Sequence, residues 1–141
     1  MQTIEIRQNK KALTIMLALL AAGWIGLNYY IYVLKGLKTN TELNILNIAL
    51  TGIMAYAIYR GTKKLRSNEP VLIFTKSELT ININGDPESF LWLQIIEWEI
   101  GRDENYYLLI KTGDAKRKVS LAWLEKKPAE IRELMIEYSR K

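Results

Sequence analysis

The pattern of apolar and charged positions divides the chain into an apolar first half and a mixed second half. Residues 12–34 form a run of 23 without a charged side chain. At about 1.5 Å per residue, a helix of this length crosses a hydrocarbon core of roughly 30 Å. In lipid only a helix or a closed barrel satisfies its backbone groups, and one long segment cannot be a barrel strand. We therefore predict a transmembrane helix over residues 12–34.

A second apolar run covers residues 43–59, which is near the short limit for a membrane span. Residues 35–42 form a short polar connection, so we expect an antiparallel helical hairpin with an external loop. Residues 60–68 are predicted to be a basic juxtamembrane linker, and residues 1–11 a cytoplasmic N-terminal segment.

Basic residues flank both predicted spans on the same side, whereas the loop carries only Lys35 and Lys38. The positive-inside rule then places both termini in the cytoplasm and the chain in the cell (inner) membrane. We expect the flanking residues to contact anionic membrane lipids. They are Arg7, Lys10, Lys11, Arg60, Lys63, Lys64 and Arg66. Cleavage of a signal peptide at Ala21-Ala22-Gly23 is the alternative, but a cleaved signal would not need an apolar run reaching Leu34.

The charge balance also argues against nucleic acid as a partner. Residues 1–66 contain nine Lys and Arg against two Asp and Glu, whereas residues 67–141 contain eleven against thirteen. A nucleic-acid-binding domain should carry its positive charge on the folded portion, and here the excess belongs to the membrane half.

Polar and small residues within the spans predict how the helices pack. Ala18, Ala22 and Gly26 are spaced by four, a small-residue pattern that allows close helix approach, although Ala and Gly are also simply frequent in such helices. In an antiparallel hairpin Asn28 and Asn47 lie at similar depth. We expect them to face each other and share a hydrogen bond.

The second half reads as short strands followed by one helix. Ile96, Trp98 and Ile100 alternate with Glu97 and Glu99, which predicts a strand with one buried face. Further strands are expected over 71–75, 79–84, 90–93, 106–112 and 118–123, with turns at 84–87, 103–105 and 113–114, and a short N-terminal strand lies within residues 1–8. Pro128 opens an amphipathic helix whose apolar stripe includes Ile131, Leu134, Met135 and Tyr138.

Antiparallel strands closed by an amphipathic C-terminal helix resemble the pleckstrin-homology-like fold. The segment Trp92–Ile95 is similar to the W-x-x-I pattern of small bacterial two-helix membrane proteins with a cytoplasmic pleckstrin-homology-like domain. The resemblance implies a membrane α-helical hairpin plus an α+β domain over 69–141, built as a small antiparallel barrel or sheet. Residues 69–141 are few for this fold, so Thr3–Arg7 could complete the sheet and cover an exposed edge. The first hairpin turn, Lys76–Glu78, has one lysine, so phosphoinositide binding is not carried over.

Common catalytic and metal-binding designs are excluded by composition. The chain has no cysteine and no histidine, which rules out thiolate and imidazole metal sites and Ser-His-Asp triads. Glu97 and Glu99 are the nearest approach to paired catalytic acids, but a solvated strand face explains them better. We predict no catalytic, cofactor-binding or metal residue, no cofactor, and no enzymatic activity.

Two surfaces of the second half are candidates for binding. Lys116, Arg117 and Lys118 form a predicted basic turn that could touch a protein partner or lipid, with a plain solvated hairpin as the alternative. Aromatic residues could line a ligand groove, although in a small domain they more often form the core. They are Trp92, Trp98, Trp123, Tyr106 and Tyr107.

The leading hypothesis is a membrane-anchored adaptor or scaffold whose cytoplasmic domain binds another protein or associates with itself. A small membrane modulator or immunity-type protein that acts through its transmembrane hairpin is the alternative. A ligand-sensing domain with an aromatic pocket is a third hypothesis, which requires a sizeable interior cavity.

Overall fold

The computed structural model describes the chain except for Met1, residues 35–40 and Lys141. It divides into two compact units. We call Lys10–Ser67 the helical hairpin, and we call the second unit, which combines the N-terminal segment with residues 68–141, the sheet unit. Most of the predicted external loop, including Lys35 and Lys38, lies outside the described residues.

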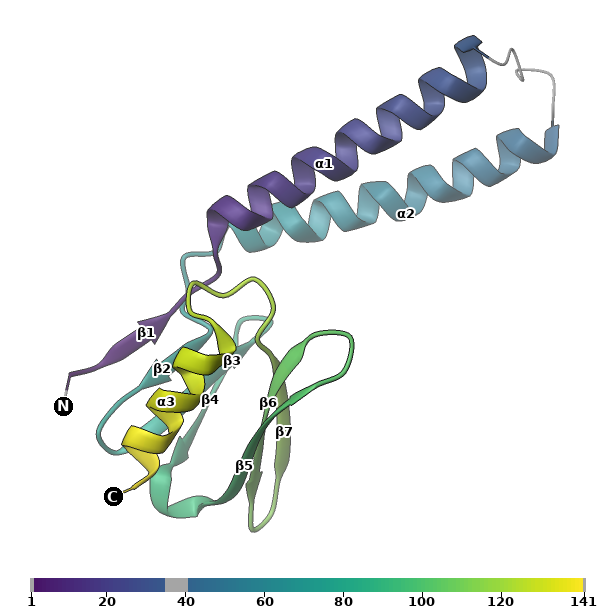
Figure 1. Ribbon diagram of the computed structural model, residues 1–141. Helices are drawn as coiled ribbons and strands as arrows, with labels where there is room; N and C mark the ends of the chain where they lie inside the picture. Colours follow the sequence, from purple (N-terminus) through teal and green to yellow (C-terminus); the bar gives the residue numbers. More distant parts are fainter. Residues whose placement is uncertain (1, 35–40, 141) are drawn as a thin grey trace. The chain divides into compact units, whose positions relative to one another are not determined.

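The helical hairpin consists of two antiparallel helices, α1 (Lys10–Tyr29), which continues as the π-helical turn η1 (Tyr30–Leu34), and α2 (Thr41–Arg66) (Figure 1). Both are long and apolar enough to cross a membrane. Helix α2 continues past Tyr59, the predicted end of the second span, so most of the residues predicted as a basic linker over 60–68 are helical. Lys and Arg form helices readily and are stabilised at a helix C-terminus by the macrodipole, which explains the extension.

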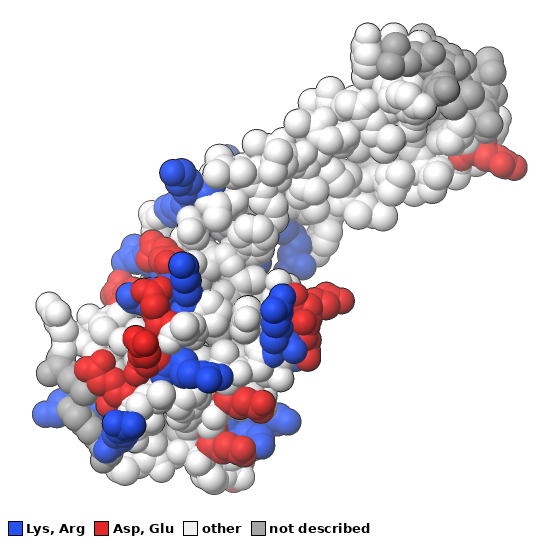
Figure 2. Space-filling view, viewed as in Figure 1, with Lys and Arg blue, Asp and Glu red and all other residues white. Residues whose placement is uncertain are grey.

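The outward surface of the hairpin is apolar. Leu19 is 69% exposed and Ile48 is 72% exposed, and neither packs in a protein interior. Figure 2 shows a face of the hairpin on which charged side chains are missing over most of the length. Large apolar side chains exposed all along two helices are typical of a lipid-facing surface.

The contact between the two helices follows a coiled-coil spacing on α2. Its more buried residues recur at alternating intervals of three and four, the spacing of a left-handed seam. They are Asn44, Asn47, Thr51, Met54, Ile58, Gly61 and Leu65. Gly61 is a point of close approach, because a Cβ atom added there would lie 2.5 Å from Cδ2 of Leu17.

The sheet unit contains two antiparallel sheets and one helix (Figure 1). The first sheet has the order β1 (Ile4–Ile6), β2 (Leu72–Phe74), β3 (Glu78–Ile83) and β4 (Asp86–Leu91). The second has the order β5 (Ile95–Arg102), β6 (Tyr106–Thr112) and β7 (Lys116–Ser120), and α3 (Pro128–Ser139) follows it. Among the described residues the two sheets do not join into a closed barrel, so the barrel form of the predicted fold is not seen.

Strand β1 belongs to the same sheet as the strands that follow the hairpin. Ile4 pairs with Phe74 and Ile6 with Leu72, so the N-terminal segment supplies the additional strand considered above. Ile6 is completely buried in the core. The helical hairpin is therefore an insertion between two neighbouring antiparallel strands.

The interior of the sheet unit is filled by an aromatic cluster of Phe74, Trp92 and Tyr138. Their ring centroids lie 5.7–6.1 Å apart. The indole N–H of Trp92 donates to the carbonyl of Thr75 at 2.9 Å, and the hydroxyl of Tyr138 donates to that of Gln2 at 2.5 Å. The tryptophan of the W-x-x-I segment is thus a core residue in the 3₁₀ turn η3 (Trp92–Gln94).

Two strand predictions need correction. Ile96 is 75% exposed rather than inward-facing, because Ile95 pairs with Thr112 and Glu97 with Lys111, which leaves Ile96 as the extra residue of a β-bulge. The last strand was expected over 118–123, but β7 ends at Ser120. The backbone turns away at Trp123, where φ is 61°.

Substitution of Gly61 by Leu should destabilise the hairpin by about 1–3 kcal/mol, since the new side chain must displace Leu17 from a packed seam. Gly52→Leu is the matched control, because a Cβ atom at Gly52 meets nothing within 4 Å. Both changes remove a glycine from the same helix. Thermal unfolding in detergent micelles, followed by circular dichroism at the helix band, measures the difference. Equal midpoints for the two variants would contradict the close contact.

Candidate functional site

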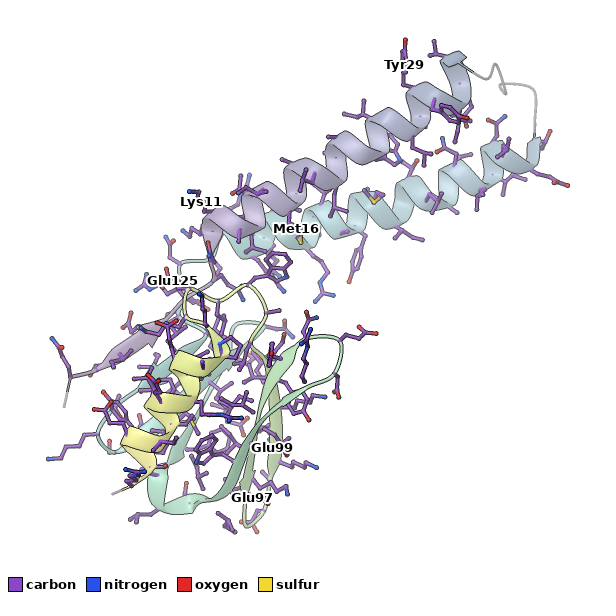
Figure 3. All side chains as sticks on the ribbon, viewed as in Figure 1. Lys11, Met16, Tyr29, Glu97, Glu99 and Glu125 are labelled. Atoms are coloured by element: carbon purple, nitrogen blue, oxygen red, sulfur yellow. The ribbon has the colours of Figure 1, made fainter. Side chains whose placement is uncertain are left out.

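Basic side chains gather at one end of the helical hairpin. Because the helices are antiparallel, the first turn of α1 and the last turns of α2 lie at the same end. Lys10, Lys11, Arg60, Lys63, Lys64 and Arg66 are all exposed there. Figure 3 labels Lys11 at this end and Tyr29 towards the other. Such a cluster suits phosphate headgroups, at about 1 kcal/mol per residue near an anionic surface.

Arg7, the remaining predicted lipid contact, belongs to the sheet unit instead. Its Nη2 atom lies 2.7 Å from Oε2 of Glu5, and both side chains are partly exposed. An ion pair of this kind leaves less positive charge available for a headgroup, so Arg7 is the weakest member of the predicted set.

The opposite end of the hairpin contains two hydrogen bonds between the helices. Nδ2 of Asn47 donates to Oδ1 of Asn28 at 2.9 Å, as the antiparallel arrangement predicts. The hydroxyl of Tyr32 donates to Oδ1 of Asn44 at 2.9 Å. Nδ2 of Asn28 also donates to the carbonyl of Trp24, so these amides hold the helices together.

The small residues predicted to mediate helix packing do not face α2. Ala18, Ala22 and Gly26 are exposed, and a Cβ atom added at Gly26 would meet nothing within 4 Å. The more buried positions of α1 are Leu13, Leu17, Leu20 and Trp24. These residues lie on a different face of α1, and that face packs against α2. Within the hairpin, the small-residue stripe therefore does not pack against the other helix.

The predicted basic turn is part of a strand. Lys116, Arg117 and Lys118 lie on β7, because the hydrogen bond from the N–H of Thr112 to the carbonyl of Ala115 already closes the turn. Alternation along the strand sends Arg117 to the face opposite its two neighbours.

Two of these three basic residues form ion pairs within the sheet unit. Arg117 holds Glu88 through two hydrogen bonds of 2.7 and 3.0 Å and so links β7 to β4, which are edge strands of the two sheets. Lys118 pairs with Asp103 at 2.6 Å, and this hydrogen bond raises the pKa of Lys118. Arg117 and Lys118 therefore already have partners within the unit.

A shallow depression of about 330 Å³ lies on the face of β6 and β7, lined by Tyr107, Leu109, Lys116 and Lys118. The Nζ atom of Lys118 sits 4.0 Å from the centroid of the Tyr107 ring. Of the five aromatic residues proposed to line a groove, Tyr107 alone lines this depression. Trp92 is buried in the core and Trp98 packs against it.

The two acids on β5 lie on an exposed face (Figure 3). Nζ of Lys111 donates to Oε2 of Glu97 at 2.6 Å, and this hydrogen bond lowers the pKa of Glu97. An exposed carboxylate that is held ionised is a poor proton donor. Among the described residues, no group of three or more acidic side chains is placed to hold a metal ion.

An exposed apolar patch escaped the sequence prediction. Leu91, Leu93 and Ile96 are 44%, 92% and 75% exposed around the η3 connection between the two sheets. In the sequence these three residues belong to an apolar run, which predicts a buried strand. The 3₁₀ turn and the bulge turn them outward, and neither feature has a distinct sequence signature here.

Comparison of the chain with protein-family models, with curated proteins and with solved structures gave no match. A function has to be inferred from three features of the described residues. They are an apolar hairpin with a basic end, a filled sheet unit with paired surface charges, and the apolar patch at η3.

Substitution Lys111→Met should raise the pKa of Glu97 towards its ordinary value, because the hydrogen bond that favours the carboxylate is removed. In the unaltered protein the lowered pKa means that Glu97 contributes its full stabilisation above the ordinary value. That contribution is lost as the pH falls through the lowered pKa. Carboxyl ¹³C NMR titration measures the change, and Lys76→Met is the control. An unchanged Glu97 titration in Lys111→Met would contradict the pair.

The double substitution Lys63→Glu and Lys64→Glu should weaken binding of anionic lipid by at least about 2 kcal/mol, or roughly thirtyfold, because two headgroup contacts are lost. Lipid retained after detergent extraction, quantified by mass spectrometry, measures this. Lys76→Glu with Arg132→Glu changes the net charge equally on exposed residues of the sheet unit. If both double variants kept the same amount of phosphatidylglycerol, the basic end would not be a lipid contact.

Proposed function

We propose that this protein is a membrane-anchored, non-enzymatic adaptor whose sheet unit, a pleckstrin-homology-like domain, binds another protein or a second copy at the cytoplasmic membrane surface. The observation that carries the proposal is the insertion of an apolar helical hairpin between the adjacent strands β1 and β2. Antiparallel sheets followed by a C-terminal helix support the pleckstrin-homology-like assignment.

The two connections between the units are short. Only residues 7–9 separate β1 from α1, and residues 67–71 separate α2 from β2. With α1 and α2 in the bilayer, the sheet unit stays near the membrane surface and cannot diffuse away as a domain on one long tether could. Confinement of this kind raises its effective concentration towards other membrane-bound proteins.

The orientation follows from charge. The six basic residues at one end of the hairpin favour the cytoplasmic side of the inner membrane. The sheet unit continues from that same end, because Lys10 begins α1 and Arg66 ends α2. Both termini are then cytoplasmic.

The apolar patch of Leu91, Leu93 and Ile96 is the surface we assign to protein contact. Exposed apolar groups near one another are favourable to bury against a partner, whereas solvated ion pairs contribute little to binding. Arg117 and Lys118, expected from the sequence to contact a partner, are already engaged by Glu88 and Asp103. The patch therefore replaces them as the first surface to test.

A second candidate function is favoured by the exposed stripe of Ala18, Ala22 and Gly26. Because it faces away from α2, a helix of another membrane protein can approach it closely. The chain would then be a small modulator or immunity-type protein that acts through its transmembrane hairpin.

Photocrosslinking in intact membranes separates the two functions. A photoreactive residue is placed singly at Leu93, at Gly26, or at Lys76, an exposed control position on the sheet unit. The adaptor predicts that one protein, or a second copy, is captured from Leu93 and not from Lys76. Capture from Gly26 alone would support the modulator, and equal capture from all three positions would contradict both.

A further inference from the structure

The loop between β7 and α3 is bonded to the segment that leads into α1. The N–H of Asn9 donates to the carbonyl of Trp123 at 2.6 Å, and the N–H of Glu125 donates to that of Arg7 at 2.9 Å. Gln8 and Leu124 form an antiparallel bridge between these two contacts. All of these residues belong to the sheet unit, and Asn9 is its last residue before Lys10 begins α1.

Trp123 has an unusual backbone in this loop. Its φ of 61° lies in the left-handed region, which disfavours a bulky side chain and which glycine adopts freely. Leu121 and Leu124 on either side are buried, whereas Trp123 is 44% exposed. A large aromatic side chain is thus held partly outside the fold at a position where the backbone alone would favour glycine.

We propose that Trp123 is an interfacial anchor that inserts its indole among lipid headgroups beside the start of α1. This inference rests on the proposed membrane insertion of α1. If α1 begins at the bilayer surface, chain continuity brings Asn9 to headgroup depth, and the backbone hydrogen bond keeps Trp123 beside Asn9. An indole has an apolar body and one N–H donor, which makes the interface its preferred place in a membrane protein.

The residues that follow Trp123 suit the same surface. Lys126 and Lys127 come directly before α3, and long lysine side chains reach phosphate groups while their stems stay against apolar surface. Lys126 is only loosely paired, with its Nζ atom 3.9 Å from Oε1 of Glu130. The loop therefore carries an aromatic residue and two cations, which are residue types that an anionic interface favours.

Tryptophan fluorescence of the full chain in vesicles tests the anchor. The vesicles contain phosphatidylethanolamine and phosphatidylglycerol, with or without brominated acyl chains that quench nearby indoles. Trp123→Phe should remove part of the quenching by brominated lipid. Trp98→Phe, the matched control within the sheet unit, should leave that quenching unchanged. If Trp123→Phe is quenched like the unaltered protein, the inference is overturned.

Trp24→Phe distinguishes failure of the anchor inference from failure of the proposed function. Trp24 lies within α1 and near the middle of the predicted span over 12–34, so its removal should also reduce quenching if the helix is in the bilayer. Quenching lost in Trp24→Phe but kept in Trp123→Phe would overturn the anchor and leave membrane insertion standing. No loss in Trp24→Phe would overturn both.

Two further measurements test the anchor even if Trp123→Phe does not fold. Because the chain has no cysteine, Ala122→Cys and Lys76→Cys each accept a single nitroxide label. The nitroxide at position 122 should be relaxed more by lipid-soluble oxygen than by a water-soluble nickel complex, and the nitroxide at position 76 should show the opposite order. The same order at both positions would overturn the anchor. Trp123→Gly should melt no lower than the unaltered protein, since glycine suits this φ, yet lose the same part of the lipid quenching as Trp123→Phe. A lower midpoint with quenching retained would assign Trp123 to the fold alone.

Discussion

The pairing of β1 with β2 is the constraint on which the rest of the structure depends. Neighbouring antiparallel strands lie about 5 Å apart, so the helix that follows β1 and the helix that precedes β2 start and end close together. Few residues connect the two strands to the inserted segment, so this segment must begin and end at nearby points. Two antiparallel helices with a continuous seam satisfy this requirement, and their apolar outward faces suit a lipid environment.

This topology also makes the sheet unit depend on both ends of the chain. The pairing of β1 with β2 closes a loop that contains the whole hairpin, between Ile6 and Leu72, and α3 contributes Tyr138 to the same core. The entropy of closing so long a loop grows only slowly with its length. A formed helical hairpin would remove much of that remaining freedom, because antiparallel helices bring the two ends of the inserted segment together.

The sequence predicts the features that depend on periodicity and length. The two apolar helices, the strand at residues 4–6 and the hydrogen bond between Asn28 and Asn47 follow from such patterns. The outward turn of Ile96 does not, because one extra residue in a strand reverses which face a side chain takes. The placement of Arg117 on a strand, paired with Glu88, also depends on how two separate sheets meet, which local pattern does not contain.

The distribution of charge decides what kind of recognition the sheet unit can offer. Several of its exposed cations already have partners, as Lys111 has Glu97 and Lys118 has Asp103. Such pairs are screened by salt and satisfied within the chain, so they contribute little to binding an external charge. Leu93 and Trp123, in contrast, leave apolar surface exposed to solvent. Burial of such surface releases water and is favourable, so we expect these apolar side chains to contribute more to a contact than the paired charges do.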